Sequence, residues 1–192
     1  MRYKAIIISI KGTKLTSREK DLISKEKPWG IILFKRNLKS FDQIKKLTSQ
    51  IKILTKNRKF PIIIDEEGGK VSRLTRIINH RISANVFGDL YRVNKKFCFK
   101  LYEHYIGSIC KILNKLGINI NTIPVLDVLR NNTTKIIGER SFSSDKKIVK
   151  AIGAFTIKCL HLNRTLGIIK HIPGHGATTI DSHKQLPKIK LQ

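Results

Sequence analysis

Short runs of β-branched residues alternate with amphipathic stretches along the whole chain, and this alternation constrains the fold more than any other feature of the sequence. Between the runs, apolar residues recur every three or four positions, which indicates helices. Strands that are separated by helices need crossover connections, so we expect a parallel sheet with helices packed outside it. The expected strands lie at 3–10, 30–35, 60–65, 118–128 and 166–172.

Capping signals place the ends of the expected helices. Thr16 is followed three residues later by Glu19, which is the pattern of a capping box. Gly117 is well placed to end a long helix at 94–116, because glycine adopts the left-handed conformation without strain. The remaining caps are Ser40, before a helix at 41–54, and Ser144-Asp145, before a helix that ends ahead of Gly167.

Polar residues follow several strands at the point where the strand ends. Asp65 closes the third strand, Asp127 closes the fourth, and Lys170 and His171 lie at the end of the fifth. The carboxyl ends of parallel strands carry the chemistry both in (β/α)8 barrels and in open doubly wound sheets, so position alone does not separate these folds. No GxGxxG follows the first strand, which argues against a dinucleotide site.

The chain carries a net charge of +26, from 39 Lys and Arg against 13 Asp and Glu. A basic nucleic-acid-binding protein is one interpretation, but the sequence lacks aromatic platforms and a recognised binding motif. Lys is spread along the whole chain and Ile is frequent too, as AT-rich codons favour, whereas nucleic-acid binding gives no reason to enrich a core in Ile. We therefore favour compositional drift and expect no specific nucleic-acid partner.

Other features of the composition indicate the cellular compartment of the protein. Its apolar runs are too short to cross a bilayer, so we expect no membrane partner. The three cysteines are widely spaced and form no CxxC pair, which makes a disulfide scaffold and a zinc ribbon poor interpretations. We expect a cytoplasmic protein.

Three histidines and an aspartate fall close together near the end of the chain: His171, His175, Asp181 and His183. As a metal site, they offer imidazole and carboxylate ligands of the kind that suit zinc. As an acid–base site, Asp181 could orient the imidazole of His183 and stabilise its cationic form, and histidine is well matched to proton transfer at neutral pH. These residues alone leave both mechanisms open. The histidines that we interpret as ordinary surface or helix-face residues are His80, His104 and His161.

Three carboxylates stand together at 65–67, at the end of the third strand, and Arg73 follows them. A carboxylate at this place could accept hydrogen bonds from a polyol, and Arg73 could donate them. A glycine turn with charged flanks explains the same pattern equally well, so this segment does not identify a function by itself.

Four segments occur in the order and spacing of one enzyme family: DEEGGKVSRL (65–74), IPVLDV (123–128), GERSFSSD (138–145) and KHIPGHGATTIDSH (170–183). On these segments the chain closely resembles the family 3 glycoside hydrolases, specifically the bacterial cytoplasmic β-N-acetylhexosaminidases of peptidoglycan recycling. The resemblance covers residues 3–187. The histidine loop KHxPGHG…DSH is specific to the hexosaminidase branch of that family.

The resemblance implies an α/β fold of the (β/α)8 TIM-barrel type. Such a barrel takes about 250 residues, and the sequence supplies five βα units, so we expect an incomplete barrel whose closing units are missing. We expect residues 1–192 to be the N-terminal part of a single family 3 barrel domain, cut short, with a separate C-terminal fragment as a partner that completes it. No segment of the chain resembles the one that carries the family's aspartate nucleophile, so we expect no covalent catalysis from this chain alone.

The resemblance also implies roles for individual residues. His183 would be the general acid/base of a retaining hydrolysis, assisted by Asp181. The substrate would be a muropeptide fragment with a terminal non-reducing N-acetylglucosamine, and neither a cofactor nor a metal would take part. Glu66 stands where such enzymes usually have Gln. The alternatives are a metal-dependent hydrolase that uses the histidine cluster and a basic nucleic-acid-binding protein. The residues that would line the sugar subsite are Asp65, Arg73, Arg140, Lys170 and His171.

Overall fold

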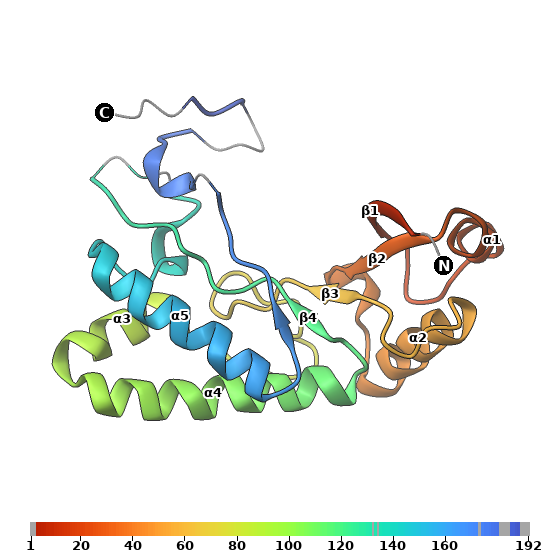
Figure 1. Ribbon diagram of the computed structural model, residues 1–192, viewed down its shortest axis with the longest axis horizontal. Helices are drawn as coiled ribbons and strands as arrows, with labels where there is room; N and C mark the ends of the chain where they lie inside the picture. The colour runs from red at the N-terminus through yellow and green to blue at the C-terminus, as the bar shows by residue number, and fades with distance from the viewer. Residues whose placement is uncertain (1–2, 132, 134, 173, 181–184, 189–192) are drawn as a thin grey trace.

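The computed structural model describes residues 3–131, 133, 135–172, 174–180 and 185–188. Among these residues, five strands form one sheet in the order β1-β2-β3-β4-β5, and every neighbouring pair is parallel. Helices make the crossovers that parallel pairs need, as the alternation in the sequence predicts. The strands are β1 (Lys4–Ser9), β2 (Pro28–Leu33), β3 (Ile62–Ile64), β4 (Ile120–Asn121) and β5 (Leu166–Gly167) (Figure 1).

The helices begin and end close to the predicted caps. The Thr16 hydroxyl accepts a hydrogen bond from the Glu19 backbone N–H at 3.2 Å, and the Glu19 carboxylate accepts one from the Thr16 N–H at 2.8 Å. The longest helix has 21 residues and is followed by Gly117 at a φ of 76°. In the described part of the chain, no helix combines the length and the apolar content needed to span a membrane. The helices are α1 (Ser17–Glu26), α2 (Phe41–Leu54), α3 (Ala84–Val93), α4 (Lys95–Lys115) and α5 (Lys146–Leu162).

Two clusters of buried side chains hold the helices against the sheet, and α4 belongs to both. In the first cluster, Leu113 of α4 joins Ile31 of β2 and Ile64 of β3. In the second, Tyr102 of α4 packs with Ile152 of α5. Figure 1 shows α4 running beneath the sheet from α3 towards α2. The helix therefore ties the two ends of the described molecule together.

Two details differ from the predicted elements. Helix α3 is not among the expected helices; Ser83 is at its N-cap position, but the side chain makes no capping hydrogen bond. Strands β4 and β5 are much shorter than the extended runs in the sequence. Their ladder is interrupted near Pro124, which has no N–H to donate. It resumes where the Leu126 N–H donates to the Lys170 carbonyl oxygen at 2.6 Å.

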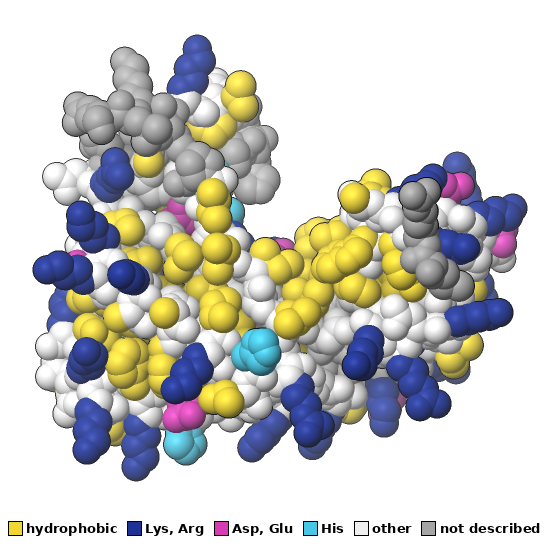
Figure 2. Space-filling view, viewed as in Figure 1, with side chains coloured by type: hydrophobic (Ala, Val, Ile, Leu, Met, Phe, Trp, Pro, Cys, Tyr) yellow, Lys and Arg dark blue, Asp and Glu magenta, His cyan; other side chains and the backbone are white. Residues whose placement is uncertain are grey.

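The two edge strands of the sheet expose apolar side chains. Ile6 and Ile7 are successive residues of β1 and are 51% and 44% exposed, so both faces of this strand are open. At and just beyond β5, Leu166, Ile168 and Ile169 are also exposed. Figure 2 shows hydrophobic side chains gathered in the recess between the two ends of the molecule. Strands of a parallel sheet are normally covered on both faces, so the described residues form an open, incomplete α/β barrel, as the sequence predicts.

Candidate functional site

The carboxyl ends of β3, β4 and β5 bring three polar side chains together. Asp65 follows β3, Thr122 follows β4, and Lys170 lies beyond β5. The Lys170 ammonium lies 3.2 Å from Asp65 Oδ1 and 2.8 Å from Thr122 Oγ1, and the Thr122 hydroxyl donates to Asp65. This is the edge of the sheet at which α/β barrels carry their chemistry.

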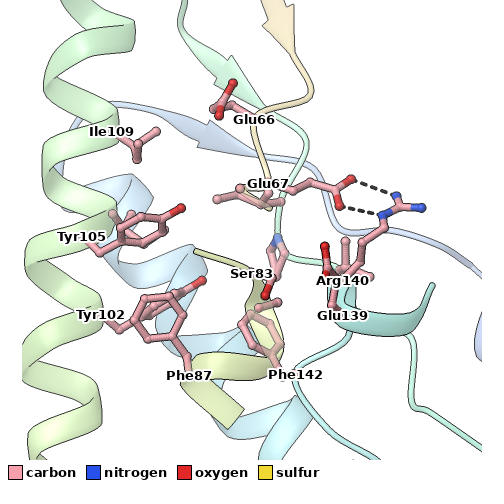
Figure 3. A pocket seen from close by; sticks show the side chains of 16 residues that line it. Glu66, Glu67, Ser83, Phe87, Tyr102, Tyr105, Ile109, Glu139, Arg140 and Phe142 are labelled. Atoms are coloured by element: carbon pink, nitrogen blue, oxygen red, sulfur yellow. Dashed lines mark hydrogen bonds and ion pairs between the residues drawn. The ribbon is translucent and has the colours of Figure 1, made fainter. Parts of the chain in front are cut away.

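A second carboxylate, Glu67, joins this group and is 5% exposed. Its Oε1 lies 2.5 Å from the Lys170 ammonium. Arg140, from a short 3-10 helix at Gly138–Arg140, donates two hydrogen bonds to Glu67 at 2.8 and 2.9 Å, drawn as dashed lines in Figure 3. Burial acts to lower the pKa of Arg140, but the paired Glu67 carboxylate outweighs it and raises the pKa. The bidentate geometry fixes the position of both side chains.

Behind the Glu67–Arg140 pair lies an apolar pocket that helices α3 and α4 line. Phe87 from α3 and Tyr102 and Tyr105 from α4 face into it, as Figure 3 shows. The Phe87 and Tyr102 rings pack with their centroids 4.5 Å apart. Apolar surroundings lower the local dielectric, which strengthens the ion pair and makes an unpaired charge at this place costly.

Charged side chains line a hollow in front of this group. Arg73 lies 3.5 Å from Asp65 Oδ2 at its edge. Burial acts to raise the pKa of Asp65, but the Lys170 ammonium, the Thr122 hydroxyl and Arg73 lower it below its ordinary value, so the carboxylate is ionised. The hollow thus offers anionic acceptors and cationic donors side by side. Its polar lining is Asp65, Glu67, Lys70, Arg73, Lys135, Glu139, Arg140, Lys170, His171 and His175.

His171 is held at the rim of the hollow by Asp127. The Asp127 carboxylate is buried and lies 2.6 Å from Nδ1 of the imidazole. It also accepts backbone N–H bonds from His171 at 3.3 Å and from Gly176 at 2.9 Å. Burial acts to raise the pKa of Asp127, but the hydrogen bonds from His171 and Gly176 lower it overall.

Glu66 points away from the hollow, although its two neighbours face it. Its side chain is fully buried and accepts backbone N–H bonds from Arg73 at 2.8 Å and Leu74 at 2.9 Å. Its other oxygen lies 2.7 Å from His80 Nε2, and the hydroxyl of Tyr105 lies 3.1 Å from His80 Nδ1. The interpretation of His80 as an ordinary surface or helix-face residue is therefore wrong, because its side chain is 13% exposed and joins Glu66 to α4. Burial raises the pKa of Tyr105 well above its ordinary range.

The structure brings five of the seven predicted site residues to one edge of the sheet: Asp65, Arg73, Arg140, Lys170 and His171. Asp181 and His183, the predicted acid/base residues, lie outside the described residues. Asp181 and His183 are also two of the four candidate metal ligands, so the structure describes only the other two, His171 and His175. In the part of the chain that the structure describes, no three metal-ligating side chains cluster. The His171 and His175 rings meet edge to face with centroids 5.0 Å apart.

Three residues of the site are missing from the predicted set: Glu67, Thr122 and Asp127. Alternation along an extended segment could have indicated Glu67, because residues 65 and 67 point to the same side. Asp127 stands out in the sequence as a carboxylate at a strand end, but nothing local links it to His171, which is 44 residues away. Thr122 carries no signal in the sequence.

The lowered pKa values of Asp65 and Asp127 predict a loss of stability in acid. An unfolded Asp titrates near pH 3.9, so in acid the unfolded chain binds more protons than the folded one. The stabilising contribution is complete above about pH 5, and it is lost as the pH falls through the unfolded and then the folded-state pKa values. Urea unfolding midpoints measured from about pH 7 to about pH 3 should show this decline. Asp127→Asn should make the decline shallower, and an unchanged slope in that variant would contradict the assignment.

Comparison with known proteins adds an independent finding. Residues 4–192 match the glycosyl hydrolase family 3 N terminal domain. The β-hexosaminidase of Stenotrophomonas maltophilia strain R551-3 is 30% identical over 178 residues, which cover 93% of this chain and 52% of that protein. Beta-hexosaminidase A of Pseudoalteromonas piscicida is 33% identical over 189 residues, which cover 92% of this chain and 30% of that protein.

Solved structures agree with the sequence match. Native NagZ from Neisseria gonorrhoeae superposes with a TM-score of 0.88 at 30% identity, covering 96% of this chain and 54% of that one. NagZ from the same organism in complex with N-trifluoroacetyl-D-glucosamine gives a TM-score of 0.83 at 31% identity, with the same coverage of both chains. The chain thus spans about half the length of most of these relatives.

Proposed function

The chain belongs to glycosyl hydrolase family 3, and from this premise we propose that its charged hollow binds the terminal N-acetylglucosamine of a β-linked saccharide, as part of a β-N-acetylhexosaminidase. The observation that carries the proposal is the group formed by Asp65, Glu67, Arg140 and Lys170 at the ends of three parallel strands. Sugar hydroxyls both donate and accept hydrogen bonds, and this group presents acceptors and donors within one hollow. The β-hexosaminidases that match the chain support the choice of sugar.

The proposed chemistry is a retaining hydrolysis. We assign His183 as the general acid/base and Asp181 as the residue that assists it, on their place in the DSH segment. A histidine in this role is neutral before the reaction, so it does not repel an anionic nucleophile as a second carboxylate would. The nucleophile has no counterpart among the 192 residues, and we assign it to none of them. The proposed substrates are muropeptide fragments that arise during peptidoglycan recycling, and the proposed location is the cytoplasm.

The proposed partner of the chain is a polypeptide of further βα units. The exposed Ile6 and Ile7 on one edge of the sheet and Ile168 and Ile169 beside the other are apolar surface of the kind that such units cover. A closed barrel has eight parallel strands, and the described part of the chain supplies five of them. Added units would pair with both edges and shield the apolar recess.

A complementation assay tests this proposal. The purified chain is mixed with the part of the Neisseria gonorrhoeae relative that lies beyond the matched segment, and turnover of a chromogenic N-acetyl-β-glucosaminide is followed. We expect turnover from the mixture and none from either polypeptide alone. Asp65→Asn and His183→Ala should each abolish it in the mixture. Association of the two polypeptides without turnover, or turnover that survives His183→Ala, would contradict the proposal.

A further inference from the structure

The buried carboxylate of Asp127 dictates which nitrogen of His171 carries the proton. Both of its oxygens are engaged: Oδ2 with the Nδ1 and the backbone N–H of His171, and Oδ1 with the Gly176 N–H. An ionised carboxylate only accepts hydrogen bonds, so Nδ1, at 2.6 Å, must be the donor. In a neutral imidazole the other nitrogen, Nε2, then carries a lone pair and accepts.

The surroundings of His171 keep the ring in this orientation. The His175 ring packs against it at an interplanar angle of 87°. Gly174 adopts a φ of 122°, and a Cβ atom there would lie 3.5 Å from both the Asp127 carboxylate and the His171 carbonyl oxygen. Gly174 therefore lies next to both members of the Asp127–His171 pair.

The imidazole of His171 is partly open to the hollow. The side chain of His171 is 30% exposed and lines the hollow together with Asp65 and Lys170. Among the described residues, no hydrogen bond reaches His171 Nε2. Its neighbour Lys170 can only donate, and the Asp65 carboxylate already accepts from Lys170 and Thr122.

We propose that Asp127 is a positioning residue that holds His171 in the Nδ1–H tautomer, so that Nε2 accepts a hydrogen bond from a hydroxyl of the bound saccharide. The choice of a saccharide as the ligand depends on the proposed function, whereas the assignment of the tautomer depends only on the contacts of Asp127. In this arrangement His171 complements Lys170 and Arg73, which can bind only the oxygen atoms of the sugar hydroxyls. The site thereby distinguishes a hydroxyl from an ether oxygen at this position, because only the hydroxyl has a proton to donate.

Histidine nitrogen chemical shifts measure the tautomer directly. We would record two-bond ¹H–¹⁵N correlation spectra of the ¹⁵N-labelled chain at neutral pH and assign His171 by the signals that disappear in His171→Gln. The expected spectrum has a protonated Nδ1 and an unprotonated Nε2. A protonated Nε2, in either the other tautomer or the imidazolium form, overturns the proposal. The tautomer is read from the spectrum of the unmodified chain, and the His171→Gln variant serves only to assign the signals.

Titration with N-acetylglucosamine tests the second half of the proposal. The His171 Nε2 resonance should shift in a saturable way, while those of His104 and His161, which lie on α4 and α5, stay constant. Asp127→Asn should weaken binding about tenfold, the equivalent of one lost hydrogen bond, and change the His171 tautomer populations. Saturable binding without a shift at Nε2 overturns the role of His171. A complete lack of binding overturns the proposed function, while the tautomer measurement still decides the role of Asp127.

Discussion

Replacing Glu67 with alanine should lower the free energy of unfolding by about 3–5 kcal/mol, the cost of removing one partner from a buried ion pair. Glu67 is 5% exposed and neutralises two cations, Arg140 and Lys170. Its removal leaves Asp65 as the remaining anion in contact with Lys170, while Arg140 faces an apolar pocket without its bidentate partner. Urea denaturation followed by circular dichroism measures the change.

Two control variants separate burial from charge in this experiment. Glu67→Gln keeps the volume and an acceptor oxygen, so it should cost less than Glu67→Ala while still weakening the site. Asp89, which pairs with Arg92 on the surface of α3, is 66% exposed on its side chain, and Asp89→Ala should cost less than about 0.5 kcal/mol. A Glu67→Ala variant as stable as Asp89→Ala would show that the buried cluster is not held by this carboxylate.

Replacing Glu66 with alanine should cost at least about 3 kcal/mol, because several hydrogen-bonding groups lose their acceptor at once. The N–H groups of Arg73 and Leu74 and the Nε2 of His80 all lie within 2.9 Å of its carboxylate. The side chain is fully buried, so water does not replace these bonds without opening the segment. Urea denaturation followed by circular dichroism measures this loss. The NMR resonances of the His80 side chain should also shift in the Glu66→Ala variant.

Glu66→Gln is the matched variant, and we expect it to cost less than about 1 kcal/mol. The amide oxygen can accept from both backbone N–H groups. The amide NH₂ can donate to His80 Nε2 if the imidazole proton moves to Nδ1, where it can bind the Tyr105 hydroxyl. Equal losses in the Gln and Ala variants would mean that the negative charge of Glu66, rather than its hydrogen bonds, stabilises this segment.

Local signals in the sequence were enough to predict most helices and the parallel sheet. Helix α2 begins at the predicted cap, since Ser40 accepts the N–H of Gln43 at 3.3 Å as an N-cap should. The strand ends also predicted which edge carries the charged residues. Capping and hydrophobic periodicity are properties of neighbouring residues, so they can be read without knowing the tertiary structure.

The residues that were missed depend on contacts between distant parts of the chain. Thr122 lies 57 residues from its partner Asp65, and Asp127 lies 44 residues from its partner His171. The pairing of His80 with Glu66 likewise requires the chain to turn back on itself between them. Periodicity indicates which side of a strand a residue faces. Its partner on the next strand depends on the register of the two strands, which the neighbouring residues in the sequence do not determine.

The most direct test of the central claim is a titration of the ¹⁵N-labelled chain with N-acetylglucosamine, followed through its backbone amide resonances. We predict saturable shifts confined to the segments around the hollow, at 65–73, 121–127, 138–140, 170–172 and 174–176, with loss of the response in Asp65→Asn. Shifts that instead gather on the helices α1 and α2, or that persist unchanged in Asp65→Asn, would contradict the assignment of the hollow as the saccharide site.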